Sequence, residues 1–396
     1  MKLLINAESL RPPLTGIGNY TFNLLDTLQQ LQQIERIDCF SGRHFSTVQA
    51  TLSNCIDACS ASHAERGAQT HSAVANRLRE RLRQSSLAYR ARELMRNSAM
   101  LAGTLRRRDY LYHEPSFILK AHSGPCIATI HDLSFIRYPQ FHPPQRVEWL
   151  IRQLPRTLAR ADAIITDSEY VRHELIGEFG LDPGKVTAIA LGAADRYRPQ
   201  DSSETRQTME RYGLRHGGYL LFVGTLEPRK GLDTLLDAWS MLPPAMQQAY
   251  PLVLAGAPGW NNQALRERID RLIAKGGLKH LSFVDEHSLP ALYSGAAIFV
   301  SPSLYEGFGL PLLEAMRCGA ATLCTANTSM AEFAGGGTQL FAGGDACQLA
   351  ERIQQLLERP AERQKLAQAG LLHSQQFSWT RCAQRTCEVY ASLSRP

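Results

Sequence analysis

The stretch AIFVSPSLYEGFGLPLLEAMRCGAATLCTA, residues 297–326, contains the unit that decides the fold. An apolar run leads through a loop with two glycines into a helix expected from Pro311, and a second apolar run follows. Pro is favoured in the first turn of a helix, where its missing N–H would have no partner. Continuous apolar strands that alternate with helices predict a parallel sheet covered by helices on both faces.

The same alternation extends over most of the 396 residues. In the second half, YLLFVG, PLVLAG and HLSFV precede helices that we expect from about residues 232, 262 and 289. In the first half, the expected strands are KLLINAE, IDCF, PCIATIHDL, AIITDS and KVTAIALG, with helices at about 19–31 and 144–159. We therefore predict the α/β class, with two doubly wound parallel-sheet domains that face each other across a cleft.

The length of the chain exceeds what one hydrophobic core usually supports, which agrees with two domains. We expect them at residues 1–195 and 196–377, with a terminal helix in residues 378–396. The small and polar residues 58–76 predict a mobile loop.

The composition is that of a soluble globular protein, with 44% hydrophobic and 20% charged residues. No apolar run approaches the roughly 18–20 residues of a membrane span, and the apolar start is too short for a signal peptide, so we expect a cytosolic protein. The nine cysteines are expected to be reduced and mostly buried. Because D-x-D, H-E-x-x-H and EF-hand patterns are all missing from the sequence, we expect no metal site.

Two cations follow a strand in VGTLEPRKG, residues 223–231, at the amino end of an expected helix. Arg229 and Lys230 there oppose the helix dipole, and a bound anion would reverse this cost. Free N–H groups together with Arg and Lys favour phosphate oxygens. The alternative is a pair of solvated cations with Glu227 and Asp233 as local partners.

Two further loops follow strands of the first half. LTGIGNY, residues 14–20, contains Gly16 and Gly18, which fit a ligand loop and a structural turn equally well. TIHDLSF, residues 129–135, brings His131 to the cleft side, where it can donate or accept a proton. A purely structural histidine is the alternative.

Glu306 and Glu314 bracket the loop of the opening stretch. We place Glu314 in the first helical turn, where the helix dipole favours a carboxylate, but no helix argument explains Glu306. The N–H groups of Gly309 and Leu310 lie between the two carboxylates. Carboxylates accept hydrogen bonds from vicinal hydroxyls, so the spacing suggests a sugar, a diphosphate and a ribose held in sequence.

Together these motifs resemble the retaining GT-B glycosyltransferases of the large E-x7-E family, family 4, which includes sucrose synthases, bacterial mannosyltransferases and lipopolysaccharide glycosyltransferases. Glu306 and Glu314 match the E-x7-E motif, GTLEPRKG the phosphate loop, TGIGNY the glycine loop, and His131 the histidine that follows a strand. ITDSEYVRHELI and IALGAADRYRP also resemble family segments. The chain departs from the family at LGAAD and at NTSMAEFAGG, where Ser329 and Glu332 are kept but Ala331 replaces a proline.

The resemblance implies a role for each matched residue. Arg229 and Lys230 would neutralise the donor diphosphate, Glu314 would bind ribose, and His131 and Glu306 would lie at the transferred sugar. The implied catalytic residues are His131, Arg229, Lys230 and Glu306, and the implied donor-binding residues are Gly16, Gly18, Thr225, Val284, Leu289, Gly307, Phe308, Gly309, Leu310 and Glu314. The last helix would cross back to the first domain.

The resemblance is strongest to enzymes that use GDP-mannose or GDP-D-rhamnose to build O-antigen or other surface polysaccharide. It implies transfer with retention, without a metal, to a polyprenyl-diphosphate-linked glycan. Alternatives are a UDP or other nucleotide sugar as donor, a GT-B nucleotide-sugar epimerase, an NAD-dependent oxidoreductase and a non-catalytic nucleotide-sugar-binding protein.

Residues 77–108 contain ten arginines and only two glutamates, interleaved with apolar residues. This composition fits a basic amphipathic segment on an anionic membrane, which would make the protein peripheral on the inner face of the cytoplasmic membrane. A solvated helical face fits equally well. Nucleic acid is the least favoured partner, because no nucleic-acid-binding motif accompanies the arginines.

Overall fold

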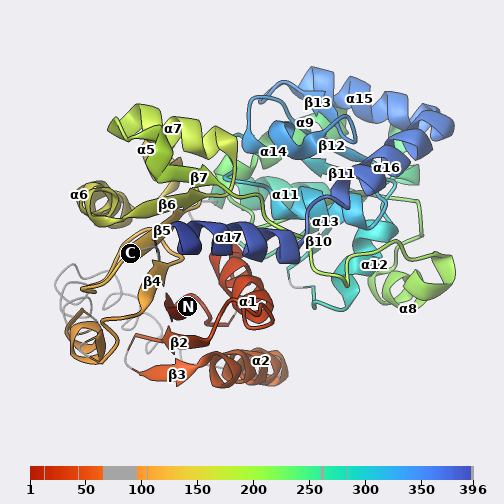
Figure 1. The fold of residues 1–396 in the computed structure, drawn as a ribbon. Helices are drawn as coiled ribbons and strands as arrows, with labels where there is room; N and C mark the ends of the chain where they lie inside the picture. Colours follow the sequence, from red (N-terminus) through yellow and green to blue (C-terminus); the bar gives the residue numbers. More distant parts are fainter. Residues whose placement is uncertain are drawn as a thin grey trace, which may run out of the picture.

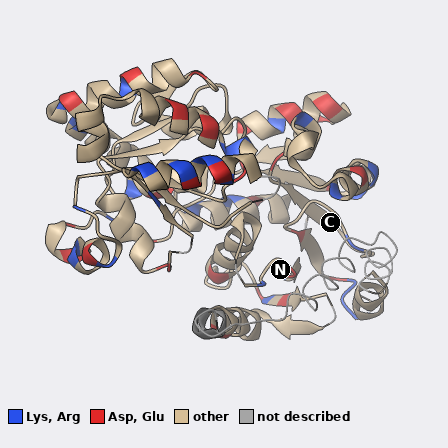
Figure 2. Ribbon diagram, turned by 180° about the vertical axis from the view of Figure 1, so that it is seen from behind, with Lys and Arg blue, Asp and Glu red and all other residues tan. Residues whose placement is uncertain are grey.

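The computed structural model describes residues 1–12, 14–42, 44–65, 95, 97–104, 106–259, 263–282 and 284–393. These residues form two β-sheets, one in each half of the chain (Figure 1). Helices cover both sheets, and Lys, Arg, Asp and Glu lie mainly on helices and loops rather than on strands (Figure 2). The predicted α/β class with two parallel-sheet domains is therefore confirmed.

The first sheet has seven strands in the order β3-β2-β1-β4-β5-β6-β7. Every pairing is parallel except that of β2 with β3 at one edge. The strands are β1 (Lys2–Asn6), β2 (Arg36–Phe40), β3 (Phe45–Thr47), β4 (Leu111–Glu114), β5 (Cys126–Ile130), β6 (Ala163–Thr166) and β7 (Val186–Ala188). The sequence prediction missed β3 and β4.

The helices of this half connect the strands and cover the sheet. They are α1 (Gly16–Leu28), α2 (Val48–Glu65), α5 (Ser134–Arg137), η1 (Pro139–Phe141), α6 (Pro144–Arg160), α7 (Glu169–Phe179) and η2 (Pro183–Lys185). The prediction that residues 58–76 form a loop is wrong for residues 58–65, which lie in α2, and the remainder falls outside the described residues.

The second sheet has six parallel strands in the order β10-β9-β8-β11-β12-β13. They are β8 (Leu220–Val223), β9 (Leu252–Ala255), β10 (Leu278–Leu281), β11 (Ile298–Ser301), β12 (Thr322–Thr325) and β13 (Gln339–Phe341). The expected strands of this half are all present. The order reverses between β8 and β11, which is where a doubly wound sheet binds ligands.

The helices of the second half are α8 (Ser202–Tyr212), η3 (Pro228–Lys230), α9 (Leu232–Met241), α10 (Pro244–Ala249), α11 (Gln263–Lys275), α12 (Ser288–Ser294), α13 (Leu310–Arg317), α14 (Ser329–Ala334), α15 (Ala346–Glu358), α16 (Pro360–Ser374) and α17 (Trp379–Leu393). The predicted starts of α9 and α11 agree with the structure to within one residue. The helix predicted from Pro311 starts one residue earlier.

Helix α17 returns to the first half of the chain, where it lies beside α1 (Figure 1). Its Tyr390 is fully buried and lies 2.7 Å from Nδ1 of His113 on β4. One apolar cluster continues from Leu3 and Ile5 of the first sheet, through residues of α17, to Leu221 of the second. The last helix therefore ties the two halves together.

The two chain segments that connect the halves cross at Gly192, next to an isolated bridge between Ala193 and Ser378. A Cβ atom at Gly192 would lie 2.1 Å from the backbone nitrogen of Trp379 and 2.3 Å from the carbonyl carbon of Ser378. Both neighbours are backbone atoms, so only a residue without a side chain fits this crossing.

No helix in the described ranges is long and apolar enough to cross a membrane. Most of residues 77–108, the predicted membrane-binding segment, lies outside those ranges. Within them, Arg107 is not a solvated cation, because its Nε donates to Asp38 Oδ2 at 2.7 Å and its guanidinium lies 4.2 Å from the ring centre of Phe45.

We predict that Gly192→Ala lowers the thermal unfolding midpoint, because the added methyl group costs about 1–3 kcal/mol of packing strain. Gly177→Ala is the matched control: it lies in α7 with nothing within 4 Å of the added Cβ. That change is expected to raise stability by about 0.5–1 kcal/mol through helix propensity. Equal midpoints for the two variants would contradict the tight crossing.

Candidate functional site

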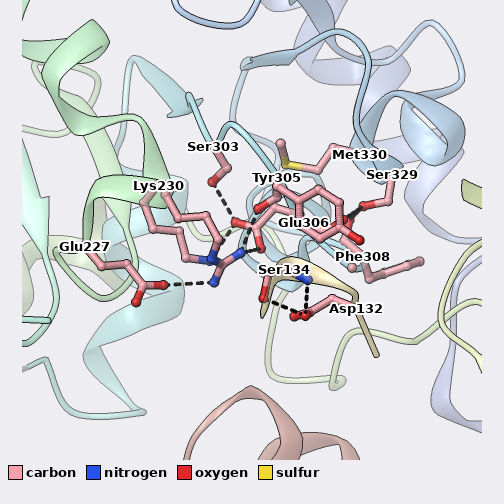
Figure 3. A network of polar contacts seen from close by, with 12 residues as sticks. Asp132, Ser134, Glu227, Lys230, Ser303, Tyr305, Glu306, Phe308, Ser329 and Met330 are labelled. Atoms are coloured by element: carbon pink, nitrogen blue, oxygen red, sulfur yellow. Dashed lines mark hydrogen bonds and ion pairs between the residues drawn. The ribbon is translucent and has the colours of Figure 1, made fainter. Parts of the chain in front are cut away.

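A buried cluster of charges joins two loops at the carboxyl edge of the second sheet, after β8 and after β11. Lys230 Nζ donates to Glu306 Oε1 at 2.6 Å, and an Arg229 nitrogen lies 3.5 Å from Glu306 Oε2. Ser303 Oγ donates to the same Oε1 at 2.6 Å. Figure 3 shows Ser303 and Lys230 converging on Glu306 from opposite sides. The structure thus brings together three of the four predicted catalytic residues.

The charge on Glu306 is held strongly by this cluster. Burial alone raises the pKa of a carboxyl, but the charges of Lys230 and Arg229, with hydrogen bonds from Lys230 and Ser303, lower the pKa of Glu306 to about 2. The side chains of Arg229 and Lys230 are only 12% and 16% exposed. The alternative of two solvated cations is therefore wrong.

Arg229 is fixed by acceptors on several sides. It donates to Glu227 Oε1 at 2.8 Å and to the carbonyl oxygen of Tyr305 at 2.7 Å. Asp233, the other suggested partner, instead pairs with Arg268 of α11. Asp132 of the first half faces the cluster (Figure 3); burial raises the pKa of its carboxyl, but Arg229 and the hydrogen bonds from Ser134 outweigh this and lower it.

The loop after Glu306 makes two close approaches that require glycine. A Cβ atom at Gly307 would lie 2.0 Å from the carbonyl oxygen of His131 in the first half. Gly309 has φ +106° and caps the amino end of α13, and a Cβ atom there would lie 2.6 Å from Met330 Cγ. The backbone of this loop is therefore packed between the two halves of the chain.

Within the described part of the chain, the N–H groups of Gly309 and Leu310 make no hydrogen bond. Ser329 fixes the backbone of the loop, because its Oγ donates to the carbonyl oxygen of Glu306 at 2.7 Å. The Phe308 side chain is buried and stacks on Phe333 at 4.5 Å. Phe308 thus contributes backbone, not an open aromatic face, to the loop.

His131 follows β5 and is buried, with both ring nitrogens engaged. Nδ1 lies 2.7 Å from Asp167 Oδ2, and Nε2 donates to the carbonyl oxygen of Pro115 at 2.7 Å. Burial by itself lowers the pKa of His131, but the Asp167 carboxylate and the Pro115 carbonyl outweigh it and raise the pKa. In this arrangement no ring nitrogen is available to a ligand.

Glu314 lies apart from the charge cluster, on α13. Because α13 begins at Leu310, Glu314 is in its second turn, and the prediction of a first-turn carboxylate is wrong. Its Oε2 accepts a hydrogen bond from Tyr293 of α12 at 2.9 Å. Burial raises the pKa of Glu314 to about 7 against the opposing effect of that hydrogen bond and of Arg196.

The remaining predicted donor residues lie in several places. Gly16 and Gly18 are in the first turn of α1, not in a loop before it, so the predicted helix start at residue 19 is wrong. A Cβ atom at Gly18 would lie 2.9 Å from the carbonyl oxygen of Ser9, whereas Gly16 faces open space. Thr225 is exposed after β8. Val284 and Leu289 are half-buried and pack against the main core.

Comparisons with known proteins show which family the chain belongs to. A model described as Glycosyltransferase Family 4 matches residues 14–194, and one described as Glycosyl transferases group 1 matches residues 207–372. O-antigen chain mannosyltransferase B of Escherichia coli is 32% identical over 99% of this chain and 100% of its own length. The chain belongs to the family 4 glycosyltransferases.

A second relative covers less of the transferase. The serotype-specific mannosyltransferase WbdA of Escherichia coli is 35% identical over 59% of this chain and 29% of its own length. The predicted family, and with it the activity class of glycosyltransferase, is therefore confirmed.

Solved structures share the fold of the transferase. HepE of Anabaena in complex with UDP and glucose has a TM-score of 0.70 at 17% identity, and covers 99% of this chain and 100% of its own. Sucrose-phosphate synthase from Thermosynechococcus elongatus has a TM-score of 0.72 at 21% identity, over 99% and 98% of the two chains.

Sequence reasoning missed several side chains that build the site. Ser303 lies three residues before Glu306, a spacing that could have suggested the contact. Asp167 is the last residue but one of AIITDS, an expected strand, so its place beside His131 follows from the neighbouring strands β5 and β6. Tyr305 gave no signal, because its partners are distant in sequence.

We predict that the stability of the transferase depends on pH through Glu314. Its folded pKa of about 7 lies above the ordinary value, so the native state binds the extra proton and loses stability as pH rises from about 5 to 8. Glu314→Gln keeps an acceptor for Tyr293 and removes the titration, and should gain about 1–3 kcal/mol relative to wild type over that range. Parallel pH profiles of the unfolding midpoints would contradict a buried, proton-binding Glu314.

Proposed function

We propose that the transferase moves mannose or D-rhamnose from a GDP-sugar to a lipid-linked glycan in O-antigen or other surface polysaccharide synthesis, with retention of configuration. The proposed donor site rests on one observation. Arg229 and Lys230 are buried around the single carboxylate of Glu306, where the strands of the second sheet end. The sugar and the pathway are supported by the full-length similarity to an O-antigen mannosyltransferase.

The donor diphosphate takes the place that Glu306 holds between the two cations. Two phosphates offer Arg229 and Lys230 more charge and more acceptor oxygens than one carboxylate does. The N–H groups of Gly309 and Leu310, at the amino end of α13, bind further phosphate oxygens. Released from Lys230, Glu306 accepts hydrogen bonds from hydroxyls of the transferred sugar, and Glu314 accepts them from ribose.

The reaction breaks the bond between the sugar's anomeric carbon and the diphosphate oxygen. That oxygen keeps the electron pair, and Arg229 and Lys230 stabilise its charge in a buried site without a metal. The acceptor hydroxyl attacks the same face and forms the new glycosidic bond, and its proton passes to the departing diphosphate. Configuration at the anomeric carbon is thereby retained.

His131 acts in this scheme through its position rather than through proton transfer. Its two ring nitrogens are engaged with Asp167 and Pro115. Its carbonyl oxygen packs against Gly307. The residue thus lies beside the transferred sugar, and its carbonyl oxygen fixes the position of the loop that carries Glu306.

The acceptor is a polyprenyl-diphosphate-linked glycan, whose lipid lies in the cytoplasmic membrane. The arginine-rich residues 77–108 bring the enzyme to that anionic surface. Sedimentation with liposomes tests this part alone, and failure to bind acidic liposomes even at low salt would exclude the membrane contact.

We predict that calorimetry detects binding of GDP-mannose or GDP-D-rhamnose at least about tenfold tighter than binding of UDP-, ADP- and dTDP-sugars, which corresponds to about 1.4 kcal/mol. The solved relative HepE is in complex with UDP and glucose, so UDP-glucose is the most informative competitor. Preference for a UDP-sugar would overturn the proposed donor and leave the glycosyltransferase class unchanged.

We predict that Glu306→Gln lowers transfer at least about a hundredfold, because a sugar contact made in the transition state is lost, while affinity for GDP is retained. Lys230→Ala should lower both quantities, because it removes a phosphate partner. Lys365→Ala, which removes an exposed lysine of α16, is the control. Near-normal transfer by both site variants would rule out the proposed site.

A further inference from the structure

Helix α7 of the first half is capped by a side chain from the second half. The carboxylate of Glu332, on α14, accepts a hydrogen bond from the backbone nitrogen of Glu169 at 2.9 Å and one from that of Tyr170 at 2.8 Å. These are the first two residues of α7. Figure 1 shows α7 and α14 next to each other, and they are in contact.

Two more contacts join α7 to the loop that carries Glu306. Ser168, the N-cap of α7, donates through Oγ to the carbonyl oxygen of Gly307 at 2.8 Å. The Tyr305 hydroxyl donates to Glu174 of α7 at 2.5 Å and accepts from the backbone nitrogen of Leu133 at 3.0 Å. Through its N-cap Ser168 and its middle residue Glu174, α7 therefore contacts this loop, the donor loop (residues 302–309), on both sides of Glu306.

The contacts of Glu332 lie across the boundary between the two halves. Within the described residues its carboxylate makes no hydrogen bond or ion pair to its own half, and the residue is exposed. A carboxylate at a helix amino end is favoured by the unpaired N–H groups and by the helix dipole. This stabilisation exists only while the two halves are together.

We propose that Glu332 is a positioning residue, which caps α7 across the domain boundary and so holds the enzyme closed with His131 and Asp132 against the donor loop. Opening separates the His131 carbonyl from Gly307 and Asp132 from Arg229. The inference rests on the proposed function for its kinetic effect, but the closure itself is independent of the donor. It also gives a role to the glutamate of NTSMAEFAGG, which the reaction scheme does not use.

The first test is Glu332→Gln, measured by small-angle X-ray scattering without ligand and by transfer kinetics. Losing the charge and one acceptor oxygen should raise the ratio of open to closed enzyme about fivefold. The radius of gyration should rise, and kcat for transfer should fall in proportion to the closed fraction, by at most about fivefold. The affinity for GDP alone should stay within about twofold. Glu351→Gln is the matched control, because Glu351 is an exposed glutamate of α15 with no hydrogen bond or ion pair to the described residues of the first half.

The second test removes the N–H group that donates the hydrogen bond, instead of the carboxylate that accepts it. Glu169→Pro deletes the N–H that Glu332 binds, at the first helical position, where proline is well tolerated. Ser168 before it is already extended, with φ −151° and ψ 157°, as a residue before proline must be. Glu169→Ala loses the same side chain but keeps the N–H, and so serves as its control.

Glu169→Pro should reproduce the opening seen in Glu332→Gln, Glu169→Ala should not, and the double variant should open less than the two single effects combined. Unchanged scattering in both Glu332→Gln and Glu169→Pro would overturn the proposal. If scattering changes as expected but no GDP-sugar is turned over by wild type, the cap stands and the proposed function fails.

Discussion

The ion cluster of Lys230, Glu306 and Arg229 is the interaction on which the rest of the site depends. The three charged side chains are each at most 16% exposed. Each charge is therefore stabilised by the opposite charge beside it rather than by water. Leaving one buried charge without its partner costs about 3–5 kcal/mol. Under the proposed function, the buried cations bind the donor diphosphate, and Glu306 keeps them paired when no donor is bound.

The fold brings these residues together through the topology of the second sheet. Strands β8 and β11 are neighbours although residues 224–297 separate them in the chain, and each ends at the same edge. The loop after β8 supplies the cations and the loop after β11 supplies the carboxylate. The first half then closes on this edge through the backbone of His131 and the amino end of α7. The site therefore needs both halves of the chain.

The fold class could be predicted from the sequence because most strands are continuous apolar runs. These runs alternate regularly with helices along the chain. The prediction failed at β4, where His113 and Glu114 interrupt the apolar pattern and are nevertheless buried. His113 contacts Tyr390 on α17, and Glu114 accepts hydrogen bonds from Asn6 on β1 and from Tyr112 on β4 itself. The partners on α17 and β1 are distant in sequence. The prediction also failed at Gly16 and Gly18, which were expected in a loop or turn before the helix but lie in the first turn of α1. Buried residues of α1 belong to the main apolar core. The charges of the site were predictable from motifs; their mutual pairing was not, because it depends on distances between loops.

The most direct test of this account follows the Glu306 carboxyl by NMR with 13C-labelled glutamate, assigned with Glu306→Gln, as GDP is added. Saturating GDP should shift the signal and move the pKa of Glu306 upward from about 2, because the diphosphate then pairs with Lys230 and Arg229. An unchanged signal and midpoint in the GDP complex would show that the diphosphate binds elsewhere, and would contradict the account.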